Sequence, residues 1–122
     1  MIRLAELDLD EPADVRVAHV RGEIDLSNAT DLTDALAEAA ADAELGLVLD
    51  LAALRHIDSA GLRLIFDLRR RLAHRRQFLA IAVDAQARVR PVLDMAAVQD
   101  TLPVVATVDE AVAAVRSAAA GS

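Results

Sequence analysis

Apolar and polar positions change their spacing along the chain, and each spacing predicts one kind of element. Alternation in residues 2–10 and 14–22, separated by a turn-like segment that contains Pro12, predicts two strands that form a hairpin. Apolar residues at helical spacing then predict a helix from Ser27 to about Ala41. Two short continuous apolar runs, residues 44–54 and 77–83, are typical of strands covered on both faces. A helical stripe lies between these two runs.

The remaining pattern predicts a third helix over Ala85 to Met95, which Pro91 should kink or shift. A short strand over Leu102 to Ala106 and a last helix over Asp109 to Ser117 follow. A strand is therefore followed by a helix four times after the hairpin. This order predicts an α/β fold with a mixed sheet, in which the N-terminal hairpin precedes strand–helix repeats with largely parallel strands.

The length of 122 residues fits one domain, which we place at residues 1–118. Residues 119–122 close the alanine-rich tail, and we expect them to be frayed or disordered.

Polar residues gather where the predicted strands run into helices. Such loops emerge at the carboxyl edge of a parallel sheet, so segments 21–28, 55–62 and 83–88 should share one rim. If the strand order makes these loops neighbours, the rim places four carboxylates around Ser59. They belong to Glu23, Asp25, Asp58 and Asp84.

Ser59 stands at a predicted helix start and has two interpretations. Its hydroxyl, or the carboxylate of Asp58, is suited to cap the free amides of the first turn. Alternatively, a phosphate on Ser59 would meet helix N–H groups and the positive end of the helix dipole, and its charge would repel a partner surface. Gly61 likewise either permits a tight start of the helix or lets the backbone of a partner approach.

The strongest run of charge is "RRRLAHRR", residues 69–76, with five arginines. We interpret it as a solvated helix face and helix end, with a contact for an acidic partner as the alternative.

Composition argues against several classes of function. The formal net charge of −7 opposes attraction to phosphate backbones, and the chain has no Trp or Tyr for stacking bases, so we expect no direct nucleic-acid partner. No cysteine is present, and the three histidines are widely spaced, which gives metal binding little support. No apolar run approaches the roughly 20 residues of a membrane helix, and the acidic N-terminus is unlike a signal peptide. We therefore expect a cytoplasmic protein without membrane insertion.

Sequence motifs for enzymes are also missing. A magnesium-dependent receiver domain needs a lysine, and the chain has none. No G-x-S-x-G, G-x-x-x-x-G-K-[ST] or G-x-G-x-x-G motif occurs. The sequence predicts a non-enzymatic module without a cofactor, so that a kinase acting on Ser59 must bring the ATP site.

Two segments carry a family resemblance: "GEID", Gly22 to Asp25, and "LVLDLAALRHIDSAGL", residues 47–62. From about Val15 to Val115 the chain resembles the STAS domain, and within it the bacterial anti-anti-sigma factors, or anti-sigma factor antagonists.

The resemblance implies a partner switch that regulates transcription, as in stress responses. Ser59 corresponds to the serine that an anti-sigma factor serine kinase phosphorylates. The unmodified protein would bind this kinase and free a sigma factor. Phosphorylation of Ser59 would stop that binding, and a phosphatase acting on phosphorylated Ser59 would restore it. The surface around Ser59 would consist of Glu23, Asp25, Asp58, Gly61 and Leu62.

The chain departs from the family pattern at two places. Ala60 stands at the usual second hydroxyl residue, and "MAAV", Met95 to Val98, replaces a later segment that usually contains glycine. STAS domains also serve as stand-alone subunits of lipid-transport ABC systems. That role is the alternative function.

Overall fold

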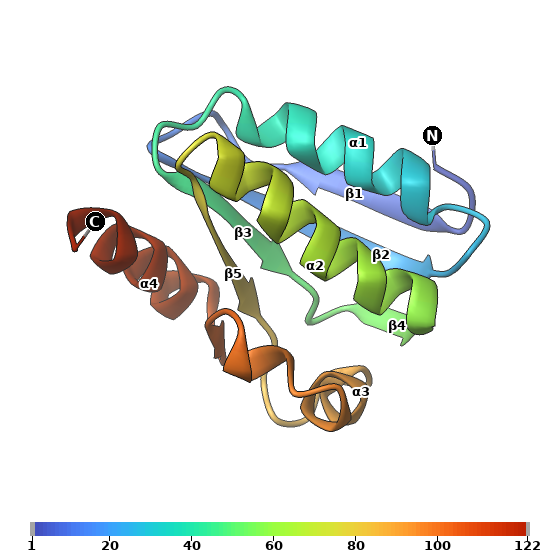
Figure 1. Cartoon of the computed structure of the whole chain (residues 1–122). Helices are drawn as coiled ribbons and strands as arrows, with labels where there is room; N and C mark the ends of the chain where they lie inside the picture. Colours follow the sequence, from blue (N-terminus) through green and yellow to red (C-terminus); the bar gives the residue numbers. More distant parts are fainter. Residues whose placement is uncertain (1, 122) are drawn as a thin grey trace.

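A mixed sheet of six strands organises the structure, a computed structural model that describes residues 2–121 (Figure 1). Five strands follow the order β1-β2-β3-β5-β6, and β4 pairs with β2 beyond the end of β3. The strands are β1 (Ala5–Leu9), β2 (Val15–Ile24), β3 (Gly46–Asp50), β4 (Leu54–Ile57), β5 (Phe78–Ala82) and β6 (Val104–Val105). Only β1 runs antiparallel to its neighbour, so the mixed sheet with an N-terminal hairpin is confirmed.

Helices cover both faces of this sheet, which is why its inner strands are continuously apolar. Helices α1 (Ala29–Ala40) and α2 (Ser59–His74) lie together on one face, and α4 (Val108–Ala120) covers the other (Figure 1). In β3, Leu47 and Leu49 belong to the core under α1 and α2, whereas Val48 between them belongs to the core under α4. Alternate side chains of one strand therefore enter different cores.

The apolar run of residues 44–54 contains a turn that the pattern concealed. We expected one strand, but β3 ends at Asp50 and β4 starts at Leu54. The Asp50 carboxylate accepts a hydrogen bond from the Ala52 amide (3.0 Å), which is the geometry of an Asx turn. The chain steps sideways here, and β4 pairs with the second half of β2.

The C-terminal elements also differ in length from the prediction. Helix α3 spans only Arg90–Met95, with Pro91 in its first turn, where the missing proline N–H costs no hydrogen bond. Of the two effects that we expected of Pro91, a kink or a shift of the helix, the structure shows the shift: the helix begins at Arg90 and not at Ala85. Strand β6 is two residues long, and α4 continues to Ala120, into the segment that we expected to be frayed. The remainder of that tail includes Ser122, which lies outside the described residues.

Ala97, in the segment "MAAV", adopts a backbone conformation that favours glycine. Its φ of 54° and ψ of 38° are left-handed, between α3 and a short 3-10 helix, Val98–Asp100. A left-handed residue with a Cβ costs roughly 1–2 kcal/mol. The substitution noted in "MAAV" therefore keeps the turn and adds strain.

His19, in the middle of β2, contacts the ends of β1 and β3 through its two ring nitrogens. Nδ1 lies 2.7 Å from Asp50 at the end of β3, and Nε2 lies 2.9 Å from Asp10 after β1. The hydrogen bond with Asp50, assisted by Asp10, raises the pKa of His19 above its ordinary value. The charged imidazole thus stabilises the fold.

We predict that His19→Gln lowers the free energy of unfolding more at about pH 5.5 than at about pH 9. The folded state raises the pKa of His19, so its stabilisation is full below the unfolded pKa and disappears as pH rises through the folded pKa. Urea unfolding at both pH values measures the difference. His74→Gln is the control, because His74 is exposed and its side chain makes no hydrogen bond within residues 2–121. An equal loss for His19→Gln at both pH values would contradict the prediction.

Candidate functional site

Parallel pairing of β2 with β4 places two polar loops side by side. Glu23 lies opposite His56 and Ile24 opposite Ile57. One step further, the Asp58 amide donates to the Ile24 carbonyl (3.2 Å). The loop after β2 and the start of α2 are therefore held together by backbone hydrogen bonds.

Gly22 allows the bend from which the first loop emerges. Its φ is +92°, and a Cβ there would collide with the Leu4 carbonyl oxygen. That same oxygen accepts a hydrogen bond from the Glu23 amide (2.9 Å). The register between β2 and β4 shifts at Gly22 and Glu23, so the glycine of "GEID" serves a bulge next to the site.

Asn28 fixes the same loop from beneath and was not among the predicted site residues. It is only 1% exposed. Its amide nitrogen donates to the carbonyls of Arg3 (2.5 Å) and Glu23 (2.8 Å), and its Oδ1 accepts from the Asp25 amide (3.0 Å). Asn28 stands at the N-cap position directly before α1, but its side chain makes no capping hydrogen bond. A polar residue one position before a helix gives no sign of which backbone groups it will bind.

Asp25 is held as a carboxylate at the surface of this loop. Its Oδ1 accepts hydrogen bonds from the Ser27 hydroxyl (2.6 Å) and the Ser27 amide (2.9 Å). The hydrogen bond from the Ser27 hydroxyl is the main cause that lowers the pKa of Asp25, and electrostatic interactions with His56 and Arg3 add to it. Between these residues, Leu26 is 81% exposed. The loop therefore presents a fixed negative charge beside an apolar side chain.

Asp58, and not Ser59, caps helix α2. The Asp58 carboxylate accepts hydrogen bonds from the amides of Ala60 (2.9 Å) and Gly61 (3.1 Å). Ser59 is the first residue of the helix; it is exposed, and its hydroxyl has no hydrogen-bond partner within residues 2–121. The interpretation of Ser59 as a capping residue is thus wrong, since Asp58 already fills that role.

Gly61 lets α2 approach the sheet closely. It is buried, and a Cβ there would collide with Ile57 Cγ1 and lie 3.1 Å from Ile24 Cγ2. The glycine therefore positions the start of the helix against β2 and β4. Gly61 affects the surface around Ser59 only by positioning the helix, because it lies on the buried side of α2, which faces the sheet.

The other predicted residues divide between surface and core. Glu23 is partly exposed on β2, and Leu62 is partly buried and packs against the core under α1 and α2. Asp84 follows β5, which β3 separates from β2. Its carboxylate accepts a hydrogen bond from the Gln86 amide (2.8 Å). The strand order thus brings the loops of Asp25 and Asp58 together and leaves Asp84 apart from them.

Comparison with known proteins agrees with this geometry. The family model of the STAS domain matches residues 6–111. The chain belongs to the STAS domain family. No curated protein sequence matches it. Within the described residues, no helix is both long and apolar enough to cross a membrane.

Several solved structures resemble the chain over nearly its full length. An anti-sigma factor antagonist from Mycobacterium paratuberculosis is 28% identical, with a TM-score of 0.77 over 92% of this chain and 94% of that one. A putative anti-sigma factor antagonist from Thermotoga maritima is 19% identical, with a TM-score of 0.74 over 93% and 96%. The anti-sigma factor antagonist SpoIIAA in its unphosphorylated form is 20% identical, with a TM-score of 0.71 over 92% of this chain and 97% of that one. The phosphorylated form of SpoIIAA from Bacillus is 18% identical, with a TM-score of 0.60 over 88% of this chain and 96% of that one.

We predict that Asp58→Ala lowers the free energy of unfolding by about 1 kcal/mol, because two amides of the first turn lose their acceptor. Ser59→Ala should change it by less than about 0.5 kcal/mol, because its hydroxyl makes no contact that holds the fold. Urea unfolding of both variants at neutral pH measures these values. A loss for Ser59→Ala as large as that for Asp58→Ala would show that the serine is the structural group.

Proposed function

We propose that the protein is an anti-sigma factor antagonist whose binding to an anti-sigma factor serine kinase is controlled by phosphorylation of Ser59. The observation that carries this proposal is the free, exposed hydroxyl of Ser59 on a helix start that Asp58 already caps. A kinase thus reaches the hydroxyl without breaking a hydrogen bond of the fold. Family membership and the 28% identical antagonist support the same function.

The unmodified partner surface comprises the loop of Glu23 and Asp25 together with the start of α2. Asp58 and Gly61 set the position of that helix start, and Leu62 anchors it to the core. The exposed side chain of Leu26 adds an apolar contact beside the Asp25 carboxylate. Such a surface, acidic with one apolar anchor, suits a partner with basic residues around an apolar pocket.

Phosphorylation transfers the γ-phosphoryl group of ATP, bound by the kinase, to the Ser59 oxygen. The O–P bond of ATP breaks, ADP leaves, and the hydroxyl proton passes to a base of the kinase. A phosphatase reverses the modification when water attacks the phosphorus, which restores the hydroxyl and releases phosphate. This chain supplies the acceptor only, so the role that we propose for it, in the cytoplasm, is non-enzymatic.

A phosphate on Ser59 would affect partner binding through its charge, because Asp58 already caps the helix. Asp58 already takes the amides of Ala60 and Gly61, so a phosphate on Ser59 does not find them free. Its charge of roughly −1.5 to −2 stays at the surface beside the carboxylates of Asp25 and Asp58. It adds repulsion and desolvation cost where the partner must contact the protein, and the partner is released.

We predict that Ser59→Glu weakens binding to the cognate anti-sigma factor at least about tenfold, because it adds a charge where the partner docks. The affinity of Ser59→Ala should lie within about twofold of that of the natural protein, because the Ser59 hydroxyl accepts the phosphate but is not needed for contact with the partner. Calorimetric titration with each anti-sigma factor kinase of the source genome measures the affinities.

Ser117→Glu is the matched control for charge, because Ser117 is exposed on α4, on the other face of the sheet. It should bind like the natural protein. Equal binding of Ser59→Glu and Ser117→Glu to a partner that the natural protein binds would contradict the switch.

A further inference from the structure

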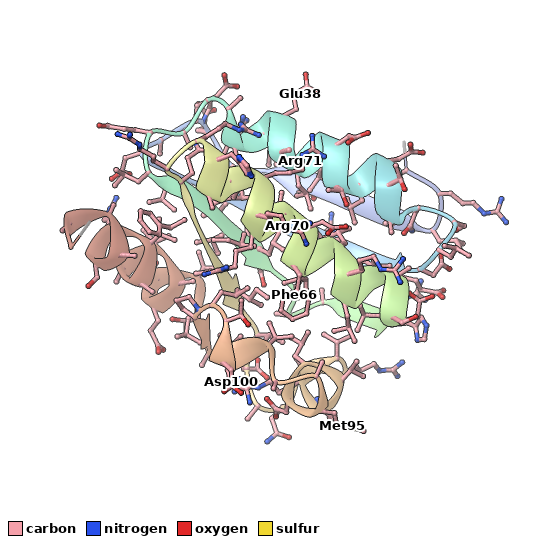
Figure 2. All side chains as sticks on the ribbon, in the orientation of Figure 1. Glu38, Phe66, Arg70, Arg71, Met95 and Asp100 are labelled. Carbon is pink, nitrogen blue, oxygen red and sulfur yellow. The ribbon has the colours of Figure 1, made fainter. Side chains whose placement is uncertain are left out.

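The five arginines of residues 69–76 divide into two groups by their contacts. Figure 2 shows Arg70 and Arg71 on α2, and both line the groove between α1 and α2. Three arginines are engaged by the fold: Arg70 with Asp67 (3.2 Å), Arg71 with Asp34 (2.9 Å) and Arg75 with the Ala37 carbonyl (3.0 Å). Arg69 and Arg76 have no ion pair or side-chain hydrogen bond within the described part of the chain. The fold thus leaves two guanidinium groups unused.

Both unused arginines line one hollow of about 550 Å³ between α2, α4 and the outer edge of β5. This volume lies in the usual range of small-molecule sites, roughly 300–1,000 Å³. The hollow is the consequence of a short β6. Strand β6 pairs only with Ile81 and Ala82, so β5 has no strand on its outer side from Phe78 to Ala80.

The walls of the hollow are apolar and made partly of small side chains. Ala73 of α2 and Ala114 and Ala118 of α4 leave the space open, and Phe78 and Leu79 of β5 also line it. Leu102 and Pro103 lie at the side where the pairing with β6 begins. An apolar chain is therefore enclosed by carbon on several sides, which favours its burial.

Gln77 also lines the hollow, but its amide group is turned into the fold. Gln77 is 7% exposed, and its nitrogen donates to the carbonyls of Ala40 (2.7 Å) and Ala43 (2.6 Å). Its Oε1 has no hydrogen-bond partner within residues 2–121 and is buried. Because this oxygen has almost no accessible surface, a ligand in the hollow does not reach it.

We propose that this hollow binds an amphiphilic acid: an acyl chain of medium length with one carboxylate. The chain occupies the apolar lining, and the carboxylate binds Arg69 and Arg76, whose planar guanidinium groups suit it. A peptide added as a strand fits less well, because the free edge of β5 is only three residues long before β6.

The site is independent of the switch at Ser59. Arg69 follows Ser59 by ten residues on the same helix, which places it about 15 Å further along the axis. Binding in the hollow therefore tests a property that the proposed phosphorylation does not require.

We predict saturable binding of dodecanoate, at concentrations below its micelle formation, with one molecule per chain. Arg69→Gln and Arg76→Gln should each weaken it about tenfold through loss of one charge-assisted hydrogen-bonding group. Ala73→Leu should abolish it by filling the hollow. Calorimetric titration gives the affinities, and circular dichroism verifies that each variant is folded.

Arg70→Gln is the matched control, since it makes the same charge change on the same helix but outside the hollow. It should bind dodecanoate within about twofold of the natural protein. Dodecanol, which lacks the charge, should bind at least about tenfold more weakly than dodecanoate. The proposal is overturned by absent or non-saturable binding, by equal effects of Arg69→Gln and Arg70→Gln, or by undiminished binding to Ala73→Leu.

Discussion

The short parallel pairing between the end of β2 and β4 is the constraint on which the site depends. It sets Glu23 beside His56 and ties Asp58 to Ile24, so the loop of "GEID" and the start of α2 become one surface. The pairing requires the chain to turn after Asp50, and it requires Gly61 to let the helix reach the strands. Residues far apart in the sequence thus serve one local geometry.

In this arrangement the adjacent residues Asp58 and Ser59 have different roles. Asp58 binds the amides of Ala60 and Gly61, and the exposed hydroxyl of Ser59 has no hydrogen-bond partner within residues 2–121. The stability of the helix start is therefore separated from the modification that we propose. A phosphate changes the charge of the surface and leaves the capping hydrogen bonds in place, which suits a switch that must release a partner without unfolding.

Periodicity predicted the layers of this fold, because strands covered on both faces and helices with one apolar stripe leave distinct patterns. It did not predict the break between β3 and β4. The turn between them consists of apolar residues, Leu51 to Ala53, and within residues 2–121 its one polar side-chain contact is the hydrogen bond from the Ala52 amide to the Asp50 carboxylate. The strand–helix order placed Ser59, Asp25 and Asp58 on one rim. It did not reveal Asn28, whose partners are carbonyls of other segments, or the separation of Asp84, which depends on strand order.

Phosphate mapping after incubation with the cognate kinase and ATP tests the central claim most directly. The account predicts a single added phosphate by intact mass, located on Ser59 by fragmentation, and none on Ser59→Ala under the same conditions. A phosphate on Ser27 or another hydroxyl, or no phosphate from a kinase that binds the protein, would contradict the assignment of Ser59 as the switch.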